Sequence, residues 1–288
     1  MKNIIDALLA FIAEELIFPV SYWYNSNLFL FLRGRAGTPL GNPSILWRFL
    51  GRIYFFIQCR LKQLNHYYYE SVLKRYTVLI KKHYTDDYAY SNVSINNATF
   101  LQQFEEGDGS IKEIFNNQAL LRFSDIQNGD SFLDCGSGPG NNILEIKKRL
   151  PKAIVKAFDL SPNSVRFIND YFKEQQVEAF VGSVLDMEVF KKIPDKSIDH
   201  VFFANMLPTV FLDSIDKTRG IRQEIISQAI RIARKNVILS EYIGPTRIVI
   251  EQKYRAIFQE DYSPYFEGAL EKGNLLLGKD MYVFHKHA

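Results

Sequence analysis

The stretch SFLDCGSGPG, residues Ser131 to Gly140, joins a short apolar run to an acid and three glycines at alternate positions. Phe132 and Leu133 are typical of a buried parallel strand, which would end at Asp134. Because glycine has no Cβ, the backbone after the strand can turn sharply and a ligand can approach it closely. From Asn141 onward, apolar residues recur at helical spacing. Strand, glycine-rich loop and helix in this order predict a nucleotide-type ligand site in an open α/β sheet.

The spacing of Gly136, Gly138 and Gly140 distinguishes two kinds of site. A dinucleotide-binding loop reads GxGxxG, and in this sequence Asn141 stands where its last glycine would be. The form DxGxGxG instead resembles the first motif of the class I S-adenosylmethionine-dependent methyltransferases. This resemblance implies that Asp134 binds the ammonium group of that cofactor, directly or through water, and that the glycines let its amino acid chain lie against the backbone. A flexible glycine-rich loop without a ligand is the alternative.

A second acid follows at the tip of the next predicted strand. Residues 153–158 are expected to form this strand, and Asp159 ends it, 19 residues after Gly140. An acid in this position is placed to accept hydrogen bonds from two ribose hydroxyls. The surrounding DLSPN resembles the second motif of the family, which implies that Leu160 packs on the adenine. The alternative role for Asp159 is a helix cap, although Ser161 could fill that role instead.

The third predicted strand, residues 177–181, is followed by a departure from the family pattern. The family usually has Gly-Asp there, with the acid on the adenine amino group, whereas this sequence has Ser183 after the glycine. A serine accepts a hydrogen bond more weakly than a carboxylate does. The resemblance therefore leaves two acceptors for the adenine, Ser183 and Asp186, and implies that Val184 offers its backbone N–H to the ring.

The fourth predicted strand, residues 198–204, leads into Asn205. Ligands bind at the carboxyl ends of parallel strands, so Asn205 is expected to border the cofactor. His200 lies near the start of this strand, away from that edge, and is interpreted as structural. The remaining expected elements are a helix over 111–123, a helix over 163–173, a helix over 221–233, a strand over 236–240 and a hairpin with strands at 274–277 and 281–285. The resemblance covers residues 111–288 and implies an α/β fold, a Rossmann-like seven-stranded methyltransferase sheet.

The front of the chain has a different character from the rest. Residues 1–82 hold 11 Lys or Arg and 4 Asp or Glu, a net charge of +7, whereas the remaining residues carry −4. We therefore expect two parts: a mostly helical, basic and aromatic-rich region at 1–105, and an S-adenosylmethionine-binding domain at 106–288. The basic part is expected to meet something anionic. It would either pack on the catalytic domain or lie on a membrane surface as an interfacial helix.

The sequence lacks the features of membrane-spanning, secreted and zinc-binding proteins. The uncharged run at 16–32 is interrupted by Pro19 and two asparagines, so neither a membrane span nor a signal peptide is expected. Two cysteines favour a reducing compartment, and we predict a cytoplasmic protein with a peripheral membrane contact left open. No Cys/His cluster has zinc spacing, so no metal is predicted. On the resemblance, Tyr84, Tyr88 and Tyr90 would belong to a lid over the cofactor.

The class of molecule that accepts the methyl group is narrowed by a motif that the sequence lacks. Asn205 is followed by Met-Leu-Pro rather than by Pro-Pro and an aromatic residue, which argues against the nucleic-acid amino-methylating enzymes that use such a clamp. We predict S-adenosylmethionine as cofactor and methyl transfer by in-line displacement to a small-molecule, sugar or lipid-linked acceptor. The alternatives are a non-catalytic S-adenosylmethionine-binding interaction protein, methylation of RNA or protein, and an aminopropyl transferase. We assign no catalytic residue. The candidates for a general base are Glu241, His83 and Tyr88, and the oligomeric state stays open.

Overall fold

The computed structural model describes residues 92–210, 212, 215–241, 262–277 and 281–287. Apart from residues 212 and 215–218, all of these belong to one compact unit, which comprises 80–210, 219–243 and 260–288. The expected helical region before residue 92, the tyrosines of the expected lid, and His83 lie outside the described residues. Among the described residues, no helix is both long and apolar enough to cross a membrane.

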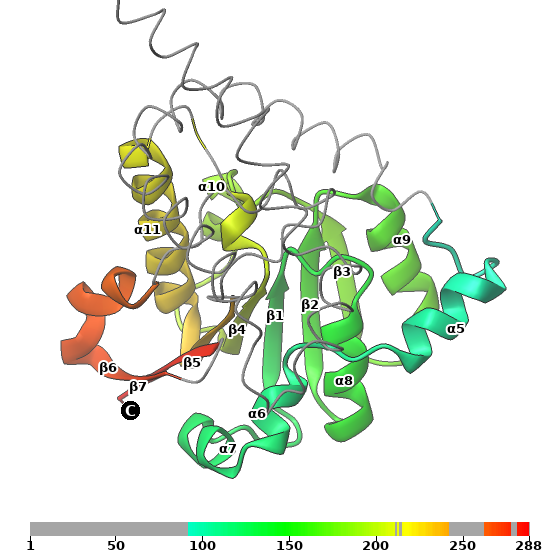
Figure 1. The fold of residues 1–288 in the computed structure, drawn as a ribbon, viewed down its shortest axis with the longest axis horizontal. Coiled ribbons are helices and arrows are strands. Elements are labelled where there is room, and N and C mark those ends of the chain that lie inside the picture. The colour runs from blue at the N-terminus through cyan, green and yellow to red at the C-terminus, as the bar shows by residue number, and fades with distance from the viewer. Residues whose placement is uncertain (1–91, 211, 213–214, 242–261, 278–280, 288) are drawn as a thin grey trace, which may run out of the picture. The chain divides into compact units, whose positions relative to one another are not determined.

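A seven-stranded sheet in the order β3-β2-β1-β4-β5-β7-β6 forms the centre of the unit (Figure 1). Its strands are β1 (Ser131–Cys135), β2 (Ile154–Asp159), β3 (Val177–Val181), β4 (Ile198–Ala204), β5 (Ala233–Ser240), β6 (Gly273–Leu277) and β7 (Met281–Lys286). Strands β1 to β5 are parallel, and β7 runs antiparallel to both β5 and β6. The seven-stranded α/β fold expected from the sequence is confirmed.

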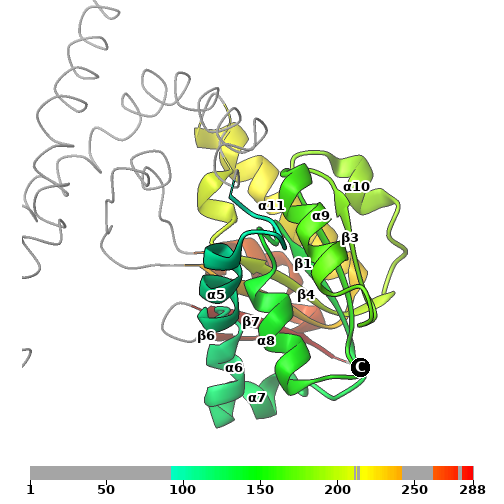
Figure 2. The same cartoon turned by 90° about the vertical axis from the view of Figure 1, so that its right-hand side faces the viewer.

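Helices cover the sheet in two groups (Figure 1 and Figure 2). They are α5 (Ala98–Glu106), α6 (Lys112–Asn116), α7 (Gln118–Ser124), α8 (Asn141–Arg149), α9 (Pro162–Tyr171), α10 (Met187–Lys191) and α11 (Ile215–Ile232), with 3-10 helices η2 (Leu207–Thr209) and η4 (Ser263–Lys272). Strand side chains alternate between two cores. Phe202 packs in the core with α8 and α9, whereas Val201 and Phe203 pack in the core with α10 and α11.

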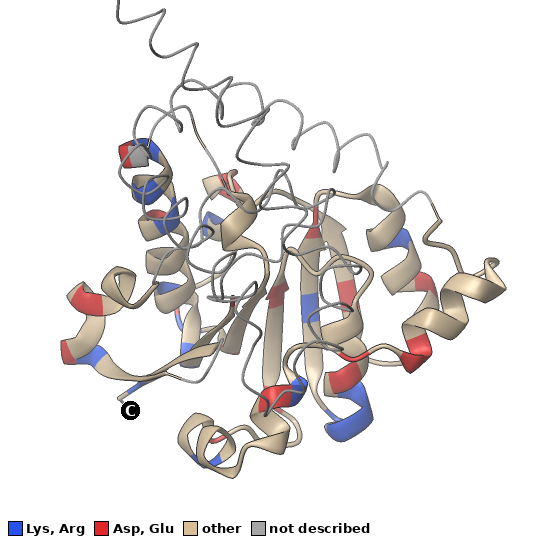
Figure 3. Ribbon diagram, viewed as in Figure 1, with Lys and Arg blue, Asp and Glu red and all other residues tan. Residues whose placement is uncertain are grey.

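Helix α8 begins directly after the glycine loop, at Asn141, as the sequence predicted. Its last turn consists of three basic residues, 147–149, which form the blue lower end of the helix in Figure 3. Positive side chains there stabilise the negative end of the helix dipole. The amino-terminal end of α8 directly follows the glycine loop, and the first N–H groups of a helix have no partner within the helix itself.

The single helix expected over 111–123 is instead two short helices, α6 and α7. The break falls at Asn117, whose backbone is extended and whose side chain accepts hydrogen bonds from the N–H groups of Ala119 and Leu120. Asparagine competes with the helical backbone for hydrogen bonds and is a strong N-cap, so it starts a new helix here. The expectation of one continuous helix was wrong for this reason.

Helix α5 packs on α9 through aromatic side chains. The ring of Phe104 makes edge-to-face contacts with Phe167 and Tyr171, at centroid distances of 4.9 and 5.1 Å. Phe104 is buried in the same core as the inner residues of α8. Residues 98–106 therefore pack as part of the sheet unit. The division of the chain at residues 105 and 106 stays a prediction, because residues 1–91 are not described.

Candidate functional site

The glycine loop after β1 has a backbone conformation that favours glycine. Gly136, Gly138 and Gly140 have φ angles of 74°, 53° and 94°. The N–H groups of Gly136 and Ser137 both donate to the carbonyl oxygen of Phe158, at 2.8 and 3.2 Å, and so tie the loop to the end of β2. A Cβ on Gly136 would lie 2.7 Å from Cγ of Met206, so this position has no room for a side chain.

Asp134, the acid before the loop, is the most unusual polar residue of this edge. Its side chain is 1% exposed, and neither carboxylate oxygen has a hydrogen-bond partner in the described part of the chain. Burial, together with the smaller effect of the Asp159 charge, raises the pKa of this carboxyl to about 8. A buried polar group without a partner costs free energy, and such groups with shifted pKa values concentrate at functional sites.

Asp159 ends β2 and joins the glycine loop to its own strand. One carboxylate oxygen, Oδ2, accepts from the N–H of Gly138 at 2.8 Å, and Oδ1 accepts from the N–H of Ser161 at 2.9 Å. The cap of α9 is Ser161, whose hydroxyl accepts from the N–H of Ser164 at 3.1 Å. The helix-cap role considered for Asp159 is therefore filled by Ser161. Leu160 follows, partly exposed beside the loop.

The residues after β3 form a tight turn of local hydrogen bonds. The Ser183 hydroxyl accepts from the N–H of Leu185 at 3.1 Å, and the Asp186 carboxylate caps α10 by accepting from the N–H of Glu188 at 3.0 Å. The side chain of Val184 packs in the core with α10 and α11. Both expected adenine acceptors, Ser183 and Asp186, thus lie on one short segment after the edge strand.

The loop after β4 is fixed by the end of β5. Asn205 has a φ angle of 50°, and its N–H donates to the carbonyl oxygen of Ser240 at 3.0 Å. Fully buried Glu241 accepts from the N–H groups of Met206 and Leu207 through Oε1, at 3.2 and 3.1 Å. Its other oxygen, Oε2, has no hydrogen-bond partner among the residues that are described. We call this arrangement the Glu241 clamp.

The electrostatics of Glu241 resemble those of Asp134. Burial raises the pKa of the Glu241 carboxyl to about 8, against the lowering effects of its two backbone hydrogen bonds and of the Arg222 charge. From the sequence, Glu241 is one of three candidates for a general base. The clamp could not be foreseen, because Glu241 is separated from Met206 and Leu207 by 35 and 34 positions in the sequence. A lone acid after a predicted strand carries no signal of such a contact.

His200 lies at the other end of the sheet. It is fully buried, and its ring nitrogens lie 2.8 Å from Oδ2 of Asp130 and 2.8 Å from Nδ2 of Asn236. At the opposite edge, the glycine loop follows β1, the loop after β4 and Glu241 follow β4 and β5, and Asp159 is the last residue of β2. Strands β1 and β4 are neighbours where the strand order reverses, which is where open α/β sheets bind their ligands.

Residues 132–223 match the family model described as a methyltransferase domain. Together with the sheet order and the glycine loop, this match defines a class I methyltransferase domain. The S-adenosylmethionine-dependent methyltransferase domain that the sequence predicts is thereby confirmed. Among the described residues, no cluster of three or more His, Cys, Asp or Glu could hold a metal ion.

Solved structures with a related fold include three from different sources. A SAM-dependent methyltransferase from Aquifex aeolicus is 16% identical, with 65% of this chain and 96% of that chain covered and a TM-score of 0.41. The CurJ carbon methyltransferase is 11% identical, with 80% of this chain and 70% of that chain covered and a TM-score of 0.47. The PH0226 protein of Pyrococcus horikoshii is 16% identical, with 70% of this chain and 99% of that chain covered and a TM-score of 0.44. No curated protein matches the sequence of the chain.

Proposed function

We propose that Asp134, the glycine loop and Asp159 hold S-adenosylmethionine, and that the acceptor of its methyl group is a small molecule, a sugar or a lipid-linked molecule. The observation that supports the cofactor site is the Asp134 carboxyl, which is buried and has no hydrogen-bond partner among the described residues. A buried carboxyl of this kind is compensated when a cation pairs with it. The ammonium group of the cofactor is such a cation.

The other residues fit the remaining parts of the cofactor. Gly136 and Gly138 lack a Cβ, so the amino acid chain can approach the backbone. Asp159, the last residue of β2, would accept hydrogen bonds from the ribose hydroxyls through its carboxylate. For the adenine we propose Leu160 as a packing surface, the Val184 N–H as a donor and Ser183 or Asp186 as acceptor, with Asn205 bordering the site.

S-adenosylmethionine supplies an electrophilic methyl group on its sulfonium when it is bound. The contribution of the chain is to orient this group toward an acceptor and to exclude water, which lowers the entropic part of the barrier. The loop after β4 forms the wall on the acceptor side, and the Glu241 clamp fixes its backbone. A rigid wall supports in-line alignment, because small displacements of the reacting atoms are costly.

The proposed acceptor class is supported by the sequence of this loop. Asn205-Met-Leu-Pro lacks the Pro-Pro-aromatic clamp used on exocyclic amines of nucleic acids. We therefore propose an acceptor that is not a nucleic acid. Once cofactor binding is established, an acceptor screen over glycans, lipids and small metabolites would follow methyl transfer by mass spectrometry.

The first test is calorimetric titration of the full chain with S-adenosylmethionine and S-adenosylhomocysteine. We expect micromolar binding, weakened about tenfold or more in Asp159→Ala, because charge-assisted hydrogen bonds to the ribose are lost. Lys173→Ala, an exposed position on the loop after α9, serves as the control and should bind as the wild type does. Absence of binding to either ligand would contradict the proposed site.

A further inference from the structure

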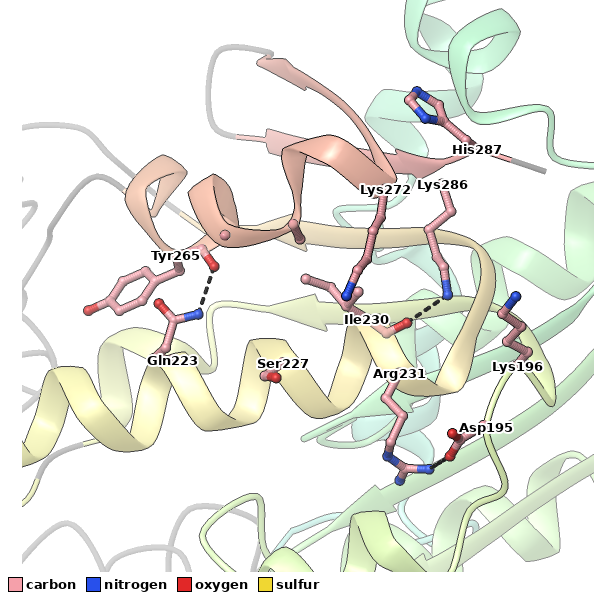
Figure 4. Close-up of a pocket in the computed structure, with 12 residues that line it drawn as sticks. Asp195, Lys196, Gln223, Ser227, Ile230, Arg231, Tyr265, Lys272, Lys286 and His287 are labelled. Carbon is pink, nitrogen blue, oxygen red and sulfur yellow. Dashed lines mark hydrogen bonds and ion pairs between the residues drawn. The ribbon is translucent and has the colours of Figure 1, made fainter.

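A hollow of about 740 Å³ lies between α11, η4 and the end of β7 (Figure 4). Its lining includes Lys196, Arg231, Lys272, Lys286 and His287. We call it the basic groove. Residues 195 and 196 precede β4 and residue 231 precedes β5, so the groove lies at the amino ends of these strands. The glycine loop follows the carboxyl end of β1, so the basic groove is distinct from the methyl-transfer site.

The positive charges of the groove are not balanced by acids. Among the residues that the structure describes, no carboxylate lies within ion-pair distance of Lys196, Lys272 or Lys286. The single acid in the lining, Asp195, is paired with Arg231. Like charges gathered on a concave surface repel one another and concentrate anions there.

Part of the positive charge has a structural role. The Arg231 guanidinium donates to the carbonyl oxygens of Phe190 and Ile193, at 2.9 and 3.0 Å, in addition to its ion pair. The Lys286 ammonium donates to the carbonyl oxygens of Ile230 and Ala233, at 2.9 and 2.6 Å, which satisfies the carboxyl end of α11. These bonds account for Arg231 and Lys286 without any ligand.

Lys196 and Lys272 have no such explanation. Their side chains make no hydrogen bond or ion pair among the described residues, yet both act electrostatically on Lys286. Burial lowers the pKa of Lys286, the charges of Lys196 and Lys272 lower it further, and the charge of Asp195 raises it by a smaller amount. In Figure 4 the side chains of Lys272 and Lys286 reach toward the last turn of α11 from the same side. The exposed Lys196 and Lys272 thus act on the same electrostatic environment as Lys286, and a bound anion would be attracted by all three charges.

The volume of the groove narrows the class of anion. About 740 Å³ is within the range of about 300 to 1,000 Å³ typical of small-molecule sites. Ile230 and Ala269 contribute apolar surface beside the lysines, which suits a ligand with an organic part. We propose that the basic groove binds the phosphate or pyrophosphate group of a small organic anion, through Lys196 and Lys272.

Calorimetric titration of the full chain with inorganic pyrophosphate at low salt tests this site. The test variant is Lys196→Asn with Lys272→Gln; asparagine is chosen because residue 196 has a φ angle of 48°, which asparagine tolerates. The control variant, Lys152→Asn with Lys173→Gln, removes the same charge from exposed positions outside the groove lining. We expect pyrophosphate to bind the wild type and the control alike, and the test variant at least tenfold more weakly.

Two results would overturn the proposal. One is no binding of pyrophosphate to the wild type at millimolar concentration; the other is equal binding by the test and control variants, which would indicate net charge alone. Titration of the test variant with S-adenosylhomocysteine should give the wild-type affinity, and this shows that the variant is folded. Single variants, Lys196→Asn and Lys272→Gln, then identify which lysine makes the contact.

Discussion

At the scale of single residues, two buried carboxyls lie at the carboxyl ends of β1 and β5. Asp134 precedes the glycine loop, and Glu241 accepts hydrogen bonds from the loop after β4. Mainly because of burial, the pKa of each carboxyl is raised to about 8. Both are therefore mostly protonated at neutral pH, which avoids a buried negative charge. A neutral carboxyl can become ionised when a cation binds beside it, so ligand binding and proton release are coupled.

This coupling predicts a proton signal from Asp134. If the ammonium group of S-adenosylhomocysteine pairs with Asp134, the carboxyl ionises, and about one proton is released per ligand at pH 7. Calorimetry in buffers of different ionisation enthalpy measures this number. Asp134→Asn, which cannot ionise, should bind more weakly and release no such proton. The same proton release in both proteins would assign the effect to another group.

The Glu241 clamp predicts a difference between two substitutions. Glu241→Gln keeps an oxygen for the N–H groups of Met206 and Leu207, whereas Glu241→Met fills the space and leaves both donors without a partner. We expect Glu241→Met to lose about 1 to 3 kcal/mol of unfolding free energy relative to Glu241→Gln. Urea denaturation measures the loss, and equal stability of the two variants would contradict the clamp.

At the scale of elements, the amino ends of β1, β4 and β5 are joined by a buried polar network. The Asn236 amide nitrogen donates to Nδ1 of His200, so that imidazole is neutral and donates from Nε2 to Asp130. The same amide donates to the carbonyl oxygen of Ser124 at 2.5 Å, and its oxygen accepts from Nδ1 of His285 at 2.9 Å. Burial lowers the pKa of His200, which favours this neutral form.

Asn236 is the centre of this network, so its removal has a large expected effect. Asn236→Ala removes a hydrogen-bond partner from buried His200 and Ser124 and from half-buried His285, and we expect a loss of about 2 to 4 kcal/mol in unfolding free energy. Gln176→Ala, at an exposed position before β3, is the control and should cost little. Thermal and urea unfolding measure both variants. A loss below 1 kcal/mol in Asn236→Ala would show that the network is dispensable.

The strands were predictable to within a few residues because each is a short apolar run bounded by turn residues. Strand β3 begins and ends where expected, whereas β5 begins at Ala233 rather than residue 236. The break at Asn117 and the Glu241 clamp were not foreseen. The first depends on whether a local cap outweighs helix continuation, and the second joins segments that only the folded sheet brings together. Local patterns do not encode such long-range contacts.

At the scale of the whole molecule, the charge is divided along the chain. Residues 1–82 carry +7 and the rest carries −4. If the basic part meets a membrane surface, the full chain should float with vesicles that contain anionic lipid at low salt, because each basic residue near such a surface gains about 1 kcal/mol. Neutral vesicles and high salt are the controls, and both should abolish flotation. No flotation with anionic vesicles would exclude the lipid contact.

The strand order has a consequence for synthesis of the protein. Strand β7, residues 281–286, lies between β5 and β6, although both are made before it. Until these residues leave the ribosome, β5 remains an open edge and β6 has no strand to pair with. Open edges invite pairing with other chains. Completion of the sheet therefore waits for the end of translation of this strand, and a chain that stops before residue 281 would expose an aggregation-prone edge.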